Sequence, residues 1–312
     1  MDLVFYPILF VAALALLIKG SDWFIESAEQ IGLALGISPY VIGVTIVAAG
    51  TSLPEMASSV AAIYQGESSI VAGNVVGSNI ANVLLILGCV AVFGKAIRVD
   101  SEVVNVDLPI LILTAFLMVF IMLDAKVSLI EALMLLVCLI IFLLNSFQAD
   151  DDDEKLEKEK REKISARTIL FLILGGVSVY FGADYTILAI SKISLELGVT
   201  PDFIALTVVA FGTSLPELVV SLNAAKRGNT GIAVGNVVGS NIFNTCAVVG
   251  VARMFGDLEV PMNVTSFGLY FMLAITIGFG VMAWSNRITK WEGAIMLVMY
   301  MFFITELSKD LL

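Results

Sequence analysis

The chain alternates long stretches of apolar residues with short polar turns, and this pattern predicts helices that cross a membrane. Charge-free runs such as 30–54, 68–94 and 229–252 exceed the roughly 20 residues that a spanning helix needs. Apolar and polar positions do not alternate within these runs, as they would in the strands of a transmembrane barrel. When one acidic residue is allowed in several of the spans, the pattern predicts ten transmembrane helices.

The predicted helices fall into two groups of five on either side of a charged segment. The first five are expected near residues 3–19, 38–64, 69–93, 106–123 and 127–147. Residues 148–163 are rich in Asp, Glu and Lys, a composition typical of a solvated linker. The sequence thus predicts three parts: a first five-helix repeat at 1–147, a charged cytoplasmic linker at 148–166, and a second five-helix repeat at 167–312.

The two groups of helices are copies of one unit. Residues 50–55 read Gly-Thr-Ser-Leu-Pro-Glu and recur unchanged at 212–217, and the octapeptide at 73–80 recurs at 235–242. Both identities share an offset of 162 residues, which chance does not produce. Because five is an odd number, the second copy enters the membrane in the opposite sense, as in many secondary transporters. The expected fold is an all-α polytopic membrane protein with ten transmembrane helices in two inverted-topology five-helix repeats.

The positions of Lys and Arg predict which way the chain lies in a cell membrane. With both termini outside, 13 of the 17 basic residues lie on the cytoplasmic side, six of them in or beside the linker. The remaining four are Lys126, Lys192, Arg253 and Lys309. Without the linker group the bias is still seven to four, so the excess of positive charge inside favours extracellular termini.

Composition narrows the classes of function. The chain is 59% hydrophobic with a mean hydropathy of +0.99, and its net charge of −11 argues against nucleic acid as a partner. Cys89, Cys138 and Cys246 are dispersed in apolar runs, which favours packing residues over a metal site or a disulfide. The chain has no histidine, so proton chemistry would have to use carboxylates. The first apolar run lacks a basic leader, which favours a retained helix over a signal peptide.

The repeated hexapeptide places a carboxylate and a proline inside apolar helices. Pro54 has no N–H and crowds the preceding turn, so backbone carbonyls around residues 48–51 are expected to be partly free. Thr51 and Glu55 are four residues apart and share one helix face, and the second copy repeats the arrangement. A simple proline kink with Glu near a headgroup is the alternative, but two inverted copies favour a cation site at mid-membrane.

A second pair of motifs supplies further oxygen ligands. Ser78 and Asn82 are four residues apart in helix three, and Ser240 and Asn244 repeat this spacing in helix eight. Each pair places a hydroxyl and an amide on one helix face. The glycines of the octapeptides form small-xxx-small pairs that allow close helix packing: Gly73 with Gly77, and Gly235 with Gly239.

The expected ligands are hard oxygen atoms, which suit calcium with its about six to eight oxygen ligands. No His or Cys joins the constellation, which argues against zinc and copper, and magnesium gives up its water more reluctantly. Two glutamates that face each other in a low dielectric repel, so without calcium we expect a proton or sodium between them. Asp22 and Asp184 lie near helix ends, where a polar helix contact or an interfacial position is expected in preference to ion binding.

The motifs at 50–55, 73–82, 212–217 and 235–244 resemble the alpha repeats of the sodium/calcium exchanger family, within the cation/calcium antiporter superfamily. The resemblance covers nearly the whole chain. It suggests a prokaryotic-type member, because the linker is too short for the large cytoplasmic regulatory domain of animal exchangers. It also implies alternating access, in which helices one and six slide across a core of helices two to five and seven to ten.

The resemblance further implies a role for each motif residue. Glu55 and Glu217 would bind calcium, and Asn82 and Asn244 would line the centre. Many relatives carry Asp at the position of Asn244, so this chain has one acidic group fewer there. The other ligands would be the backbone carbonyls of Thr51 and Thr213 for calcium and, for sodium, Ala48, Ser52, Ser78, Ala210, Ser214 and Ser240.

The sequence therefore predicts a secondary antiporter that exchanges sodium for calcium by alternating access, with no covalent chemistry and no cofactor. The expected partners are calcium and sodium ions and the lipid bilayer, and the chain is expected to act as a monomer. A calcium/proton antiporter that uses the same glutamates is the first alternative. A cation channel would need a continuous pore, which two inverted midplane sites do not favour. An enzyme is the least favoured class, because no nucleophile–base pair or cofactor motif is present.

Overall fold

The computed structural model describes residues 2–94, 97–99, 106–153, 164–197, 212–262 and 264–309. Within these residues the chain forms ten helical segments, as the sequence predicts. Four of the segments contain a short π-helical turn, written η. In chain order the segments are α1 (Asp2–Leu35); α2 (Pro39–Ile42), η1 (Gly43–Val47) and α3 (Ala48–Tyr64); α4 (Ser68–Ala81), η2 (Asn82–Ile86) and α5 (Leu87–Phe93); α6 (Leu108–Met122); α7 (Leu129–Asp153); α8 (Ala166–Glu196); α10 (Leu215–Lys226); α11 (Thr230–Phe243), η6 (Asn244–Val248) and α12 (Val249–Phe255); η7 (Val264–Gly268) and α13 (Leu269–Ala283); and α14 (Lys290–Lys309).

Seven helices in the described part of the chain are long and apolar enough to cross a membrane. The segments at 68–93 and 230–255 form the centre of the bundle, with 78% and 94% of their most apolar windows buried. Each central segment also packs against the last helix of the other repeat, because α5 contacts α14 and α12 contacts α7. The two repeats are therefore interlocked around one core.

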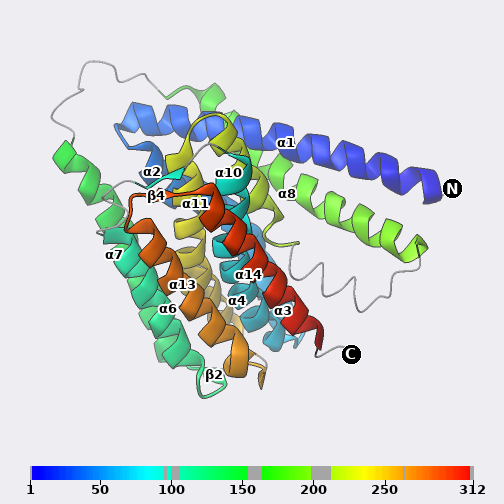
Figure 1. Ribbon diagram of the computed structural model, residues 1–312, viewed down its shortest axis with the longest axis vertical. Coiled ribbons are helices and arrows are strands. Elements are labelled where there is room, and N and C mark those ends of the chain that lie inside the picture. Colours follow the sequence, from blue (N-terminus) through cyan, green and yellow to red (C-terminus); the bar gives the residue numbers. More distant parts are fainter. Residues whose placement is uncertain are drawn as a thin grey trace.

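Helices α1 and α8 lie side by side and cross the other helices at a large angle (Figure 1). Glycines allow this close contact, because a Cβ on Gly182 would lie 2.6 Å from the backbone nitrogen of Leu17. The equivalent Gly20 approaches Ser178 and Val179 in the same way. The 34 residues of α1 span about 50 Å, more than the hydrocarbon of a bilayer, so the helix must either tilt or extend beyond it.

Short strands join the loops of the two repeats. Strand β1 (Ile97–Arg98) pairs with β4 (Arg287–Ile288), and β2 (Lys126–Val127) pairs with β3 (Leu258–Glu259), both antiparallel. The partners Ile97 and Ile288 become Glu259 and Lys126 when the offset of 162 is applied. The same cross-repeat pairing thus occurs twice, with β4 at one end of the bundle and β2 at the other (Figure 1).

The structure corrects the position of the irregularity that Pro54 was expected to cause in the turn before it. Helix α3 continues through Pro54, and the irregular turn lies earlier, in the π-helical segment Gly43–Val47. Of the carbonyls that the proline was expected to free, that of Ala48 lies 3.3 Å from the Thr51 hydroxyl.

The second hexapeptide has a different backbone. Residues 212–214 form a bend and turn, and α10 begins only at Leu215, with Pro216 in its first turn. Proline is well tolerated there, because the first N–H groups of a helix have no partner within it. Two identical sequences therefore deliver their glutamates from a continuous helix in one repeat and from a helix start in the other.

The charged linker and the repeat boundaries stay predictions. Helix α7 runs on to Asp153, past the expected end at 147, and α8 begins at Ala166. Residues 154–163, the middle of the predicted linker, lie outside the described part of the chain.

Candidate cation site

Glu55 and Glu217 lie in the interior of the bundle. Glu55 belongs to α3 and Glu217 to the first turn of α10, and these two helices contact each other. The two side chains are 1% and 0% exposed. Their carboxyl groups interact with one another, and that of Glu217 also lies against the side chains of Thr51 and Ser52. The structure therefore brings together the two carboxylates that the duplicated motif predicts.

Buried oxygen atoms around the two carboxylates lack hydrogen bonds of good geometry. Among the predicted site residues that the structure describes, this holds for all four carboxylate oxygens and for four further side-chain oxygens: Ser52 Oγ, Asn82 Oδ1, Ser214 Oγ and Asn244 Oδ1. Outside the predicted set, Ser59 Oγ and Asn79 Oδ1 are in the same state. A buried polar group without a partner costs roughly 1–3 kcal/mol, so eight of them in predicted site residues indicate a bound ligand.

The donor set suits a hard cation. Within the described residues no three His, Cys, Asp or Glu side chains are clustered, so a site here depends on two carboxylates and on neutral oxygens. Two negative charges in a dry interior match the charge of one calcium ion, and carboxylate, amide and hydroxyl oxygens are ligands that calcium accepts. The three cysteines are free and buried or half-buried, as packing residues would be.

The threonines of the hexapeptides are held by asparagines of the opposite repeat. Thr51 Oγ1 donates to Asn236 Oδ1 at 3.1 Å, and Thr213 Oγ1 donates to Asn74 Oδ1 at 2.9 Å. The amide nitrogen of Asn236 donates in turn to Ser221 Oγ at 2.9 Å, which fixes the orientation of that amide. These hydrogen bonds lock each hexapeptide to the octapeptide of the other half.

The predicted serine ligands occupy equivalent places beside the threonines. Ser240 Oγ lies 3.4 Å from Thr51 Oγ1, and Ser78 Oγ lies 3.1 Å from Thr213 Oγ1. Each serine therefore belongs to the same cluster as the hexapeptide of the opposite repeat. The offset of 162 residues maps one contact onto the other.

A chain of amides crosses the centre. Asn82 Nδ2 donates to Asn241 Oδ1 at 2.9 Å, and Asn241 Nδ2 donates to the carbonyl of Asn79 at 3.2 Å. Asn79 Nδ2 donates to Thr245 Oγ1 at 2.9 Å. The side-chain nitrogen of Asn82 is thus hydrogen-bonded, and its amide oxygen has no partner among the described residues. In Asn244 both the side-chain nitrogen and the oxygen are without a partner there.

Asn82 and Asn244 each begin a π-helical turn, η2 and η6. Such turns are rare and occur frequently at functional sites, because the extra residue rotates the side chains that follow. Segment η2 contacts α10, and η6 contacts α3. Each asparagine is thus carried by a segment that packs against the glutamate-bearing helix of the opposite repeat.

Most predicted ligands are found in this region. Thr213 is half-buried, and Ala210 lies outside the described residues. The others are buried: Ala48, Thr51, Ser52, Ser78, Asn82, Ser214, Ser240 and Asn244. The motif analysis did not assign Asn74, Asn79, Asn236 and Asn241. These asparagines recur at the same positions of both octapeptides, which could have marked them as functional. Their hydrogen-bond partners could not be predicted, because they lie more than a hundred residues away in the sequence.

A cleft of about 360 Å³ opens beside this region, between α3, α8 and the start of α10. Its walls include both hexapeptide prolines, Pro54 and Pro216, and also Thr213. Asp184 lies on the α8 side of the cleft. The cleft therefore reaches from the protein surface to the residues that adjoin the two glutamates in sequence.

The sequence model described as sodium/calcium exchanger protein matches residues 5–148 and, separately, residues 167–308. The chain belongs to the sodium/calcium exchanger family. Its two separate matches agree with the internal duplication. Members of this family are membrane ion exchangers, which are transporters and not enzymes in the catalytic sense.

Some relatives match this chain over nearly its whole length. It is 32% identical over 348 residues to the sodium/calcium exchanger MaX1 of Methanosarcina acetivorans, over 96% of this chain and 97% of that protein. Its fold is similar to the solved sodium–calcium exchanger NCX_Mj, with a TM-score of 0.85 and 32% identity over 97% of this chain and 98% of that one. Sodium/potassium/calcium exchanger 4 of Homo sapiens is 30% identical over 144 residues, which are 44% of this chain and 23% of that protein.

Proposed function

We propose that the protein is a secondary antiporter that exchanges sodium for calcium across the membrane. The observation that supports this best is the buried pair Glu55 and Glu217, one from each repeat, among oxygens that lack hydrogen-bond partners. The remaining proposed ligands are Ala48, Thr51, Ser52, Ser78, Asn82, Ala210, Thr213, Ser214, Ser240 and Asn244.

Charge balance accounts for competition between the two ions. The carboxylates of Glu55 and Glu217 can be offset by one calcium ion or by sodium ions, but excess positive charge in a low-dielectric interior is expensive. Occupancy by one kind of ion therefore opposes occupancy by the other. Calcium would leave as sodium enters, and no resident cofactor is required.

Movement of α1 and α8 would expose the site to one membrane face at a time. These two helices pack on each other through glycines, and only 33% and 22% of their most apolar windows are buried. Weak burial against the core favours their movement as a pair. The cleft beside α8 would be the open route in this conformation.

The basic residues support a proposed orientation in the cell membrane, with both termini outside and the linker inside. The surrounding partner would be the lipid bilayer, and we propose that one chain is sufficient for transport, because the proposed ligands all come from the two repeats of a single chain.

Flux measurements decide between sodium and proton coupling. Purified protein in sodium-loaded liposomes should take up calcium when the external sodium is replaced by choline. A pH gradient at equal sodium should not drive uptake. Liposomes with the Glu55→Gln variant serve as the leak control. Uptake driven by the pH gradient alone would instead support a calcium/proton antiporter that uses the same glutamates.

Asn244→Asp should make transport depend on potassium and on pH. Asn244 is fully buried and supplies oxygen without charge, so the proposed site holds two formal negative charges that one calcium balances. A third carboxylate there would need a further cation or a proton. At high pH the variant should therefore need potassium, and protonation at lower pH should restore exchange like that of the unmodified protein. The unmodified protein should exchange in potassium-free medium.

Calcium uptake into sodium-loaded vesicles, with choline in place of potassium and across a pH series, tests this role of Asn244. Asn286→Asp is a matched control, because Asn286 is exposed in a turn and has the positive φ that Asp tolerates. A strict potassium requirement of the unmodified protein would contradict the assignment.

A further inference from the structure

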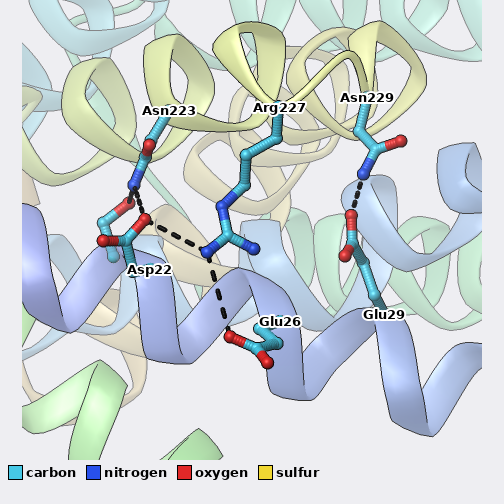
Figure 2. A network of polar contacts seen from close by, with 7 residues as sticks. Asp22, Glu26, Glu29, Asn223, Arg227 and Asn229 are labelled. Carbon is cyan, nitrogen blue, oxygen red and sulfur yellow. Dashed lines mark hydrogen bonds and ion pairs between the residues drawn. The ribbon is translucent and has the colours of Figure 1, made fainter.

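A network of charged and amide side chains ties α1 to the C-terminal end of α10 (Figure 2). Asp22 Oδ1 accepts a hydrogen bond from Asn223 Nδ2 at 2.9 Å and from Arg227 Nη2 at 3.2 Å. Arg227 Nη2 also lies 3.8 Å from a carboxylate oxygen of Glu26, one helical turn further along α1. Both anchoring residues of α10 thus converge on one aspartate.

The network continues into the turn after α10. The side chain of Asn229 donates to Glu29, so a third acidic residue on the same face of α1 is engaged (Figure 2). Arg227 and Asp22 are 32% and 28% exposed, which places their contact at the rim of the protein and not in its core. Such a contact can form and break without unfolding the bundle.

On the side of the bundle that carries this network, an aromatic ring covers the first hexapeptide, although a separate pocket lies between α1 and the start of α8. The ring of Phe24, two residues from Asp22, packs directly on Gly50, where an added Cβ would lie 2.4 Å from the ring. Phe24 is only 5% exposed. Helix α1 therefore covers the start of the first hexapeptide.

In the described part of the chain, the equivalent positions on the α8 side have neither the network nor the ring. Asp22 corresponds to Asp184, but Phe24 corresponds to the smaller Thr186. Asp184 is exposed and lines the open cleft together with Gly212, the equivalent of Gly50. The other network residues Asn223, Arg227, Glu26 and Glu29 correspond to Ala61, Gln65, Leu188 and Ser191.

We propose that Asp22, Asn223 and Arg227 form a latch that holds the α1 side of the site closed while the α8 side is open. This inference rests on the proposed alternating-access function. Two identical inverted repeats would populate both states equally, so a sequence difference must set which side is open at rest. The latch supplies that difference, because among the described residues Asp22 faces an arginine and an asparagine and its equivalent Asp184 does not.

The strength of the contacts suits a device that opens in every transport cycle. Exposed ion pairs contribute little to a conformational equilibrium, whereas hydrogen bonds to charged groups add more. A bias of this size shifts a two-state equilibrium by roughly three- to tenfold without freezing it. A fully buried salt bridge would be too costly to break and remake.

The test replaces latch residues by the residues that the other repeat has at the equivalent positions. In protein without its three native cysteines, Val219→Cys reports on the α1 side and Ala57→Cys, the equivalent position in the cleft wall, on the α8 side. Both are labelled with a water-soluble thiol reagent in detergent, where both faces are accessible. Asn223→Ala with Arg227→Gln should accelerate labelling of Val219→Cys by about three- to tenfold and slow that of Ala57→Cys.

Lys226→Gln is the matched control, since it removes the same charge from the neighbouring residue, which takes part in none of the hydrogen bonds and ion pairs of the network. Asp22→Arg combined with Arg227→Asp should restore slow labelling of Val219→Cys. Unchanged labelling in the folded double variant, or the same acceleration by Lys226→Gln, would overturn the latch. Asp22→Asn, which keeps the side-chain shape, gives the same test should the double variant fail to fold.

Labelling requires no transport, so the latch and the proposed function can fail separately. Absence of sodium-driven calcium uptake by the unmodified protein would contradict antiport, whatever the labelling shows. Normal uptake with no effect of the latch variants on labelling would contradict the latch alone.

Discussion

Replacement of either Glu55 or Glu217 by glutamine should abolish sodium-driven calcium uptake. The two carboxylates offset the desolvation of the cation, which costs several kcal/mol per ion. A single remaining charge leaves a divalent ion uncompensated in the interior. Loss of one partner of a buried charge pair costs about 3–5 kcal/mol, so uptake should fall more than about 100-fold in each variant.

Initial rates of calcium uptake into sodium-loaded liposomes measure this effect. Glu67→Gln is the matched control, because Glu67 lies exposed in the turn between α3 and α4 and should tolerate the change. In ion-free buffer the thermal stability of the two site variants should equal or exceed that of the unmodified protein, since a neutral amide replaces a buried carboxyl. Near-normal uptake by either site variant would remove the central-site hypothesis.

Gly239→Ala should both destabilise the protein and impair transport. An added Cβ would lie 2.3 Å from the carbonyl oxygen of Val44 and 2.6 Å from the Cβ of Ala48. Backbone of the π-helical segment η1 cannot move aside as a flexible side chain would, so the overpacking should cost about 1–3 kcal/mol. Ser240 follows directly and would be displaced from Thr51, which should lower calcium uptake at least about tenfold.

Gly278→Ala is the control that separates the steric effect of an added methyl group from the effect of replacing a glycine in a helix. Gly278 lies inside α13, and a Cβ there meets no atom within 4 Å among the described residues. Alanine at this helical position should keep or raise stability, by up to about 1 kcal/mol. Thermal unfolding in detergent compares the two variants. Equal melting temperatures for Gly239→Ala and the unmodified protein would contradict the close contact between η1 and α11.

The number of helices and the duplication could be predicted from the sequence, because both depend on patterns along the chain. The number of helices follows from the lengths of apolar runs, because hydrocarbon thickness fixes how many residues a span needs. Repeated strings at one offset show the duplication, and an odd helix count inverts the second copy. Because of that inversion, the sequence alone pairs Glu55 with Glu217.

The backbone conformation of the two hexapeptides could not be predicted from the sequence. Both copies contain the same proline, yet α3 continues through Pro54 while α10 begins beside Pro216. A proline inside a helix removes one hydrogen bond and one in the first turn removes none, and the surrounding packing decides which of the two places the proline takes. The sequence therefore predicted an irregularity near the site and placed it a few residues too late.

Side-chain partners across the two repeats were decided by the tertiary structure alone. Asn74 and Asn236 occur at equivalent positions of the two octapeptides. The residues around them in the sequence do not show that each accepts a hydrogen bond from a threonine of the other repeat. Asp22 and Asp184 are equivalent in the sequence, and for both we expected a polar helix contact or an interfacial position. Only the packing of α1 on α10 brings Arg227 to one of them and leaves the other at an open cleft, because contacts between residues some 200 positions apart depend on how helices dock.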